Sequence, residues 1–165
     1  MNPKRDIAFI LAALAFTGPV ILPAAADTER RQEVARRGAQ VMPFDLEQTT
    51  HLFQPLDDGG LQRVMVKDPK NRTQIALIRV HLKEEAERFH RGDFSDPAKI
   101  HGVDMPGLAE LSRGAAGVGV RYTERPDGAE IRYTAKDPAL VDAIHRWFQA
   151  QLHDHGRDAT MHMHE

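Results

Sequence analysis

Histidine and methionine are concentrated near the end of the chain. Half of the side chains between positions 153 and 164 are of these two types: His153, His155, Met161, His162, Met163 and His164. Imidazole binds borderline metals such as Cu(II), Zn²⁺ and Ni²⁺, whereas a thioether favours Cu(I). This segment therefore predicts copper binding, with zinc or nickel as alternatives. The competing interpretation is a solvated polar tail whose histidines bind metal only incidentally.

A second group of candidate ligands is scattered through the rest of the chain. It comprises His51, His81, His101, Met105 and His145. Metal sites are usually gathered from distant chain segments, so such residues can form a preformed site once the chain is folded. The alternative for each histidine is a structural role at the edge of an apolar stripe, with a single hydrogen bond.

Catalytic signatures are absent from the sequence. There is no Gly-x-Ser-x-Gly, no P-loop, no dinucleotide Gly-x-Gly-x-x-Gly and no cysteine. His81 precedes Glu84 and Glu85 by three and four residues, which would place an imidazole and a carboxylate on one helical face. A small exported enzyme with a His and carboxylate acid–base pair is thus an alternative function, and a non-catalytic partner-binding domain is another. No catalytic residue is assigned, and a protein without enzymatic activity is favoured.

The start of the chain, positions 1–26, has the three parts of a secretory signal. Lys4 and Arg5 precede an apolar stretch over 7–22, and small residues lead to Ala26. Cleavage near Ala26 would place the protein in the periplasm or outside the cell. The apolar stretch is shorter than the roughly 20 residues that a membrane-crossing helix needs, so stable membrane insertion is not expected.

Charge and composition narrow the range of partners. The formal net charge is −2, with 22 basic and 24 acidic residues, so there is no basic excess for nucleic acid or anionic lipid. The absence of cysteine excludes disulfides and thiolate metal sites. The expected partners are a metal ion and another periplasmic metal-handling protein.

The order of secondary-structure signals predicts an α+β domain built from a tandem ββα repeat. β-prone runs at 49–55 and 62–67 flank a turn, and a helix is expected over 69–90 after the Asp68-Pro69 cap. The same order recurs in the second half of the chain, with a turn at Asp127-Gly128 and a cap at Asp137-Pro138. Two such units would form a four-stranded antiparallel sheet with two long helices on one face. An approximate two-fold axis would then allow His81 and His145 to meet.

These patterns divide the chain into four parts. They are a signal peptide (1–26), a flexible charged leader (27–43), a single domain (44–152) and a His/Met-rich tail (153–165). Within the domain, the ββα units cover 44–92 and 118–152, and 93–117 connects them.

Several stretches resemble a group of small exported bacterial proteins. They are FDLEQTTHLF, RGDFSDPAKIHGVDMPGL, PDGAEIRYTAKDPALVDAIHRWFQAQLHDHG and the His/Met-rich end. Members of that group often carry the label aspartate carbamoyltransferase. This chain lacks the Ser-Thr-Arg-Thr phosphate loop and the His-Pro-x-Gln motif of true carbamoyltransferases. The resemblance therefore indicates a group of related proteins without identifying a reaction.

Overall fold

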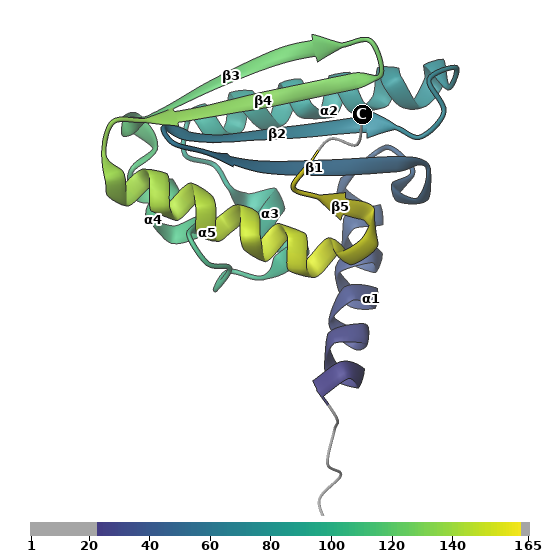
Figure 1. The fold of residues 1–165 in the computed structure, drawn as a ribbon, viewed down its shortest axis with the longest axis horizontal. Coiled ribbons are helices and arrows are strands. Elements are labelled where there is room, and N and C mark those ends of the chain that lie inside the picture. The colour runs from purple at the N-terminus through teal and green to yellow at the C-terminus, as the bar shows by residue number, and fades with distance from the viewer. Residues whose placement is uncertain (1–22, 163–165) are drawn as a thin grey trace, which may run out of the picture.

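The computed structural model describes residues 23–162. The apolar stretch of the predicted signal peptide lies outside the described residues, as do Met163 and His164 of the predicted tail. Figure 1 shows the arrangement of the elements. The helices are α1 (Pro23–Val41), α2 (Arg72–His90), α3 (Ser95–His101), α4 (Leu108–Arg113) and α5 (Pro138–His155), and the strands are β1 (Thr49–Leu56), β2 (Gly59–Val66), β3 (Val118–Arg125), β4 (Gly128–Ala135) and β5 (Ala159–Thr160).

The sheet confirms the α+β class but has one strand more than expected. Its order is β3-β4-β2-β1-β5. The first four strands pair antiparallel, whereas β5 runs parallel to β1, with Ala159 beside His51. The prediction of a four-stranded, purely antiparallel sheet is therefore wrong. The chain turns back at Gly156, whose positive φ of 56° suits glycine, and the residues that follow pair with the open edge of β1.

The two hairpins correspond closely in sequence position. The residue numbers of the second hairpin exceed those of the first by one constant offset. Strand β1 (Thr49–Leu56) corresponds to β3 (Val118–Arg125), and β2 (Gly59–Val66) corresponds to β4 (Gly128–Ala135). The helices that follow them correspond less closely. Helix α2 begins at Arg72, because the side chain of Asn71, rather than that of Asp68, caps its first turn. Helix α5 begins at Pro138 with Asp137 as its cap, as expected.

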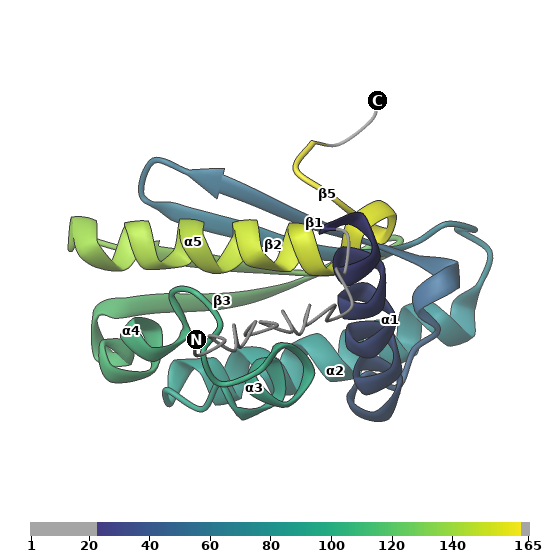
Figure 2. The ribbon, with the colours of Figure 1, turned by 90° about the horizontal axis from the view of Figure 1, so that it is seen from below.

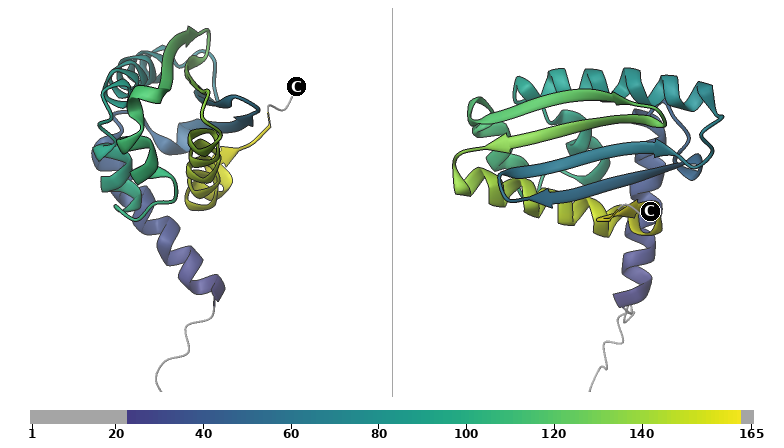
Figure 3. Two further views of the ribbon diagram at one scale, coloured as in Figure 1. Left: turned by 90° about the vertical axis from the view of Figure 1, so that its left-hand side faces the viewer. Right: turned by 45° about the horizontal axis from the view of Figure 1, so that its top comes forward.

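The core lies between one face of the sheet and the two long helices. Helix α5 packs on β1 and β2, and α2 packs on β3 and β4. Trp147 of α5 is fully buried, with the rings of Phe89 and Tyr133 edge-on to it at 5.7 and 5.5 Å between centroids. Figure 2 shows α5 crossing over β1 and β2, with α2 lower in the view, and the right-hand view of Figure 3 shows the opposite face of the sheet with no helix over it.

The charged segment expected to be a flexible leader forms most of α1. This helix packs against α3 and α5, and its first turns extend beyond the rest of the domain (Figures 1 and 3). Val34 is buried in the core, and Arg30 forms an ion pair with Asp154 of α5. Arg31 also donates to the carbonyl of His153, and Val41 packs against the core. Apolar and polar contacts together thus fix a segment whose sequence is mostly polar. Within residues 23–162, none of the helices has the length and apolar composition that crossing a membrane requires.

Candidate functional site

Three histidines from separate elements meet at the end of the sheet where β1 begins. The rings of His51 and His155 are stacked, with 4.9 Å between centroids and 9° between planes. His101, the last residue of α3, lies edge-on to His155 at 5.1 Å. We call His51, His101 and His155 the histidine cluster. Of these three residues, His51 and His101 were among the candidate ligands of the domain, and His155 was among those of the predicted tail.

The ring of His101 is oriented by a buried carboxylate. Its Nδ1 lies 2.8 Å from Oδ2 of Asp154, and both side chains are almost fully buried. Arg30 donates two hydrogen bonds to the same carboxylate, at 3.1 and 2.6 Å. Burial opposes ionisation of Asp154, but the hydrogen bonds from His101 and Arg30 outweigh it and hold the pKa of the carboxyl far below its usual range. An ionised carboxylate can only accept, so Nδ1 of His101 carries a proton and Nε2 remains for another partner.

The ring of His51 is also held at one of its two nitrogens, but there the unpartnered nitrogen is Nδ1. Its Nδ1 is buried and has no hydrogen-bond partner within residues 23–162, whereas the backbone of Asp158 bonds the ring. Because Nδ1 has no partner, the bonded nitrogen is Nε2, which leaves a lone pair at Nδ1. Burial above all, with contributions from His81 and His101, lowers the pKa of His51 to about 4. The ring is therefore uncharged at neutral pH.

His155 occupies the last position of α5. Gly156 follows it and ends the helix. Burial is the main cause that lowers the pKa of His155 well below its ordinary value, and the neighbouring His51 and His101 add to the effect. Among the described residues its ring accepts and donates no hydrogen bond. His155 therefore presents an uncharged imidazole without a fixed partner.

A small chamber of about 40 Å³, partly open to solvent, adjoins the histidine cluster. Polar side chains make up much of its wall: His51, Gln62, His81, Glu85, Asp96, His101, Gln151 and His155. Trp147 also lines it. Besides His51 Nδ1, two further buried atoms of these residues, Nε1 of Trp147 and Oε1 of Gln151, have no hydrogen-bond partner within the described part of the chain. Buried polar atoms without partners are rare in folded proteins, which marks this chamber as a polar site within the core.

Two carboxyl groups share the far side of the chamber. Asp96 accepts hydrogen bonds from Arg88 and from Lys99, which keep its pKa low despite the opposing effect of burial. Burial first, and then the charge and hydrogen bond of Asp96, raise the pKa of Glu85 to about 8. At neutral pH Glu85 is thus mainly a neutral acid that donates to an ionised Asp96.

Solvent approaches the histidine cluster from two sides. His51 and His155 also line a cleft of about 950 Å³ between α1 and the segment after α5. His101 and Asp154 line a second hollow of about 730 Å³ beside α3 and α5. The stacked pair of His51 and His155 therefore separates the inner chamber from the larger cleft.

The cluster has donors suited to a transition metal, but its rings do not converge on one point. Among residues 23–162, no group of three or more His, Asp or Glu side chains is arranged to hold a metal ion. The reason lies in the stacking of His51 and His155. The lone pair of an imidazole lies in the plane of its ring, so two parallel rings cannot both direct lone pairs at an ion about 2.0–2.1 Å away.

The other predicted ligands have different surroundings. His81 lines the chamber at the edge of Phe44, with 5.6 Å between ring centroids. His145 lies at the opposite end of β1, where its Nε2 donates to the carbonyls of Leu56 and Gly59 at 3.0 and 2.9 Å. The expected meeting of His81 and His145 is therefore wrong. A two-fold axis places equivalent residues at opposite ends of the sheet unless they lie on the axis.

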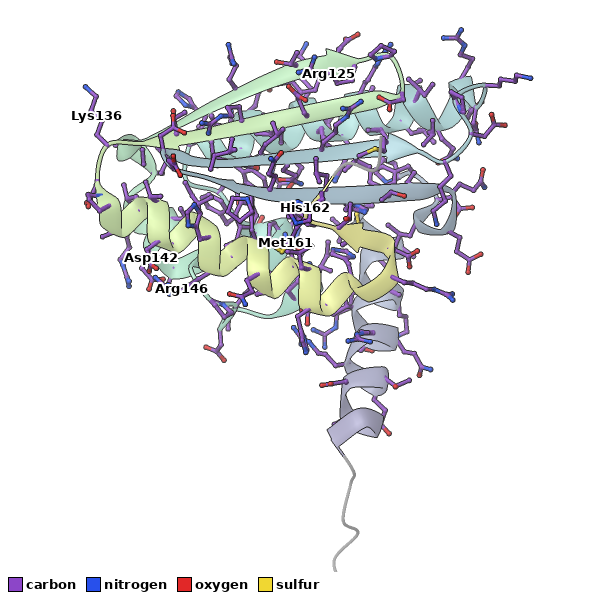
Figure 4. All side chains as sticks on the ribbon, viewed as in Figure 1. Arg125, Lys136, Asp142, Arg146, Met161 and His162 are labelled. Carbon is purple, nitrogen blue, oxygen red and sulfur yellow. The ribbon has the colours of Figure 1, made fainter. Side chains whose placement is uncertain are left out.

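The residues predicted as a tail are divided between helix and strand. His153 and His155 belong to the last turn of α5, so the domain extends beyond the expected boundary at 152. His153 is exposed, and Met105 is buried and lines the hollow beside α3. Met161 and His162 follow β5 and are exposed (Figure 4). No prediction on Met163 and His164 can be compared with the structure, because they lie outside the described residues.

Several residues of the site were not among the sequence candidates: Arg30, Trp147, Gln151 and Asp154. Trp147, Gln151, Asp154 and His155 follow one another at intervals of four, three and one positions, which is the spacing of one helical face. That spacing would have placed Asp154 and His155 with the core residues if the helix had been extended to Gly156. Arg30 left no comparable signal, because its role depends on a contact between distant elements. Glu85 was considered only as a possible partner of His81, and its place beside Asp96 could not be predicted.

Comparisons with known proteins add no identity to these geometric findings. No family model, curated protein or solved structure matches the chain.

Proposed function

We propose that this protein is an exported transition-metal-binding protein and that the histidine cluster is its principal site, with copper as the preferred metal. The observation that carries the proposal is that three imidazoles from β1, α3 and α5 lie next to one another, each with a ring nitrogen that has no partner among the described residues. In two of them a hydrogen bond to the other nitrogen fixes the ring. His101 is bonded to Asp154 and His51 to the backbone of Asp158.

The bond between His101 and Asp154 supports a metal site in particular. Histidine ligands usually donate their second ring nitrogen to a carboxylate or a carbonyl, which fixes the tautomer and increases the basicity of the ligand. Nε2 of His101 and Nδ1 of His51 are the ligand atoms that this pattern selects. His155 supplies the third when its ring turns out of the stack with His51. Its position beside Gly156, at the end of the helix, favours such a turn.

The low pKa values of the cluster alter the expected pH dependence of binding. Metal competes with protons for the lone pair, so free imidazole loses metal as the pH falls through about 6.5. The pKa of His51 is about 4, and that of His155 is also lowered. Binding at the cluster should therefore persist to about pH 5, whereas binding by exposed histidines of the tail should fail at a higher pH.

The Met and His residues after β5 are proposed as a second, weaker capture site. Parallel pairing of β5 with β1 places Ala159 beside His51, so residues from Met161 onward leave the domain close to the cluster. Imidazole and thioether together suit both oxidation states of copper. An ion captured there would need to travel only a short distance to the cleft. Another periplasmic metal-handling protein is proposed as the source or recipient of the ion.

The predicted repeat gives this arrangement a simple origin. We infer that the two ββα units descend from one repeated unit, which the constant offset between the paired strands supports. His51 comes from the first unit and His155 from the second, while α1 and α3 supply Arg30 and His101. The site thus requires both units and the segments added to them.

Metal titration of a chain that begins at Asp27 tests the proposal. We expect it to bind Cu(II) with a Kd of about 1 μM or tighter at pH 7, and the electron paramagnetic resonance spectrum should show coupling to nitrogen ligands. His155→Gln should weaken binding at least tenfold. His90→Gln, at the exposed end of α2, is the matched control and should bind as the unchanged chain does. Equal affinities of the two variants would refute the cluster as the principal site.

An acid–base enzyme is the second candidate function. The observation in its favour is that a neutral Glu85 and His101, whose ring is bonded to Asp154, line the same chamber. A carboxylic acid with a pKa of about 8 can donate a proton at neutral pH, and a carboxylate-oriented imidazole can accept one. Turnover by chelator-treated protein that is lost in Glu85→Gln would favour the enzyme over the metal-binding protein.

A further inference from the structure

The inner chamber has features that the metal proposal does not require. Besides the lone pair of His51, it is lined by Trp147 and Gln151, whose indole N–H and amide oxygen have no partner within residues 23–162. Trp147 is fully buried and Gln151 is 5% exposed. Leaving such groups unpaired in the core destabilises the folded protein. Three such atoms around one chamber indicate an occupant that forms hydrogen bonds.

The unpaired atoms define the polarity of that occupant. The indole N–H of Trp147 is a donor only, so it requires an acceptor. The amide oxygen of Gln151 and the lone pair of His51 are acceptors, so they require donors. The three atoms together thus offer one donor and two acceptors, which a small uncharged molecule that has both an acceptor and donors can satisfy.

The volume of the chamber limits the size of the occupant. A cavity of about 150 Å³ holds benzene. The chamber has about 40 Å³ and so accepts two or three heavy atoms. We propose that it is a binding site for a small uncharged molecule of two or three heavy atoms that has an acceptor flanked by donors. The molecule enters from the outer cleft when the stacked His51–His155 pair opens.

This inference does not need a bound metal, and the test uses metal-free protein. Trp147 is the only tryptophan of the chain, so its indole N–H signal reports on the chamber without ambiguity. Formamide serves as the probe, because its carbonyl can accept from Trp147 while its N–H groups donate to Gln151 and His51. A ligand of three heavy atoms cannot bind much more tightly than about 1 mM.

We expect formamide to shift the indole signal of chelator-treated, ¹⁵N-labelled protein with a saturable, millimolar dependence. N,N-dimethylformamide, which is larger and has no N–H donor, should not do so. Gln151→Leu removes the acceptor at nearly constant volume and should abolish the saturable shift. Gln149→Leu, an exposed neighbour on the same helix, should retain it.

Two results would overturn the inference. The absence of a saturable shift with formamide would mean that the chamber takes ordered water only. An equal response to both amides, or an unchanged response in Gln151→Leu, would place the binding elsewhere. Neither result affects the metal proposal, which rests on Cu(II) affinity and on His155→Gln. Conversely, binding of formamide without binding of metal would support the proposed chamber and contradict the proposed metal-binding function.

Discussion

The two ends of β1 each receive a histidine from α5, and the two imidazoles have opposite surroundings. At the turn end, His145 donates from Nε2 to two backbone carbonyls and has a structural role. At the chamber end, His155 stacks on His51 and has no hydrogen bond among the described residues. The comparison shows that the neighbours of an imidazole, and not its presence on a helix, decide whether its nitrogen is available for chemistry. We therefore expect the chamber end to respond to pH and metal, and the turn end to respond to neither.

The largest expected effect concerns Glu85 at the chamber end. Its folded-state pKa of about 8 lies above the ordinary value of 4.5, so the folded protein retains a proton that the unfolded chain releases. The contribution of Glu85 to stability is fully present below about pH 4.5 and is lost as the pH rises through 8. Glu85→Gln should therefore gain stability relative to the unchanged chain by about 1.4 kcal/mol per pH unit across this window.

Urea unfolding at several pH values between 5 and 8 measures this difference. Glu84→Gln, at the exposed neighbouring position of α2, is the control and should show no such slope. Parallel stability curves for Glu85→Gln and the unchanged chain would show that Glu85 ionises normally, and the two ends of β1 would then differ less than we propose.

Asp154→Asn tests the support of the histidine cluster. The asparagine side chain has no negative charge and only one oxygen to accept hydrogen bonds from His101 and Arg30. The imidazole of His101 therefore loses its fixed tautomer. Substitutions of this kind typically reduce metal affinity about 10–100-fold. Asp142→Asn, which alters an exposed ion pair with Arg146 on the same helix, should leave Cu(II) affinity unchanged. If both variants bind copper equally well, Asp154 has no part in the site.

The turn end offers the reverse pattern. His145→Gln removes a ring that bonds two carbonyls and should reduce the free energy of unfolding by about 1 kcal/mol. Because His145 lies away from the cluster, Cu(II) affinity should not change. Urea unfolding and copper titration of one preparation measure both quantities. A loss of affinity in this variant would contradict the separation of the two ends.

The smallest effect is expected from the residues after β5. A chain that ends at Thr160 keeps β5 paired with β1 and lacks only positions 161–165. The affinity of the histidine cluster for Cu(II) should fall less than tenfold, and a tenfold change corresponds to about 1.4 kcal/mol. One equivalent of more weakly bound copper should be lost. Loss of all tight binding on this truncation would transfer the principal site to the tail.

Secondary structure followed from local signals in the sequence. Alternating apolar residues and the Asp57–Gly60 and Pro126–Gly128 turns define the hairpins, and Asp137-Pro138 sets the start of α5, because turn and cap chemistry depends on adjacent residues. The α+β class could be predicted for the same reason. The start of α2 could not, since Asp68 and Asn71 are both suitable caps and only the folded chain selects Asn71.

The candidate site was predicted only in part, because it depends on which distant residues meet. The sequence by itself determined that the chain carries imidazoles at positions 51, 101 and 155, turn residues that reverse the hairpins, and no thiol. Only the tertiary structure decided that His51, His101 and His155 share one cluster while His145 bonds a turn. It also decided that Glu85 is buried beside Asp96, and this burial first, and then Asp96, raises the pKa of Glu85. The physical reason is that local structure depends on neighbours in the chain, whereas burial and charge depend on neighbours in space.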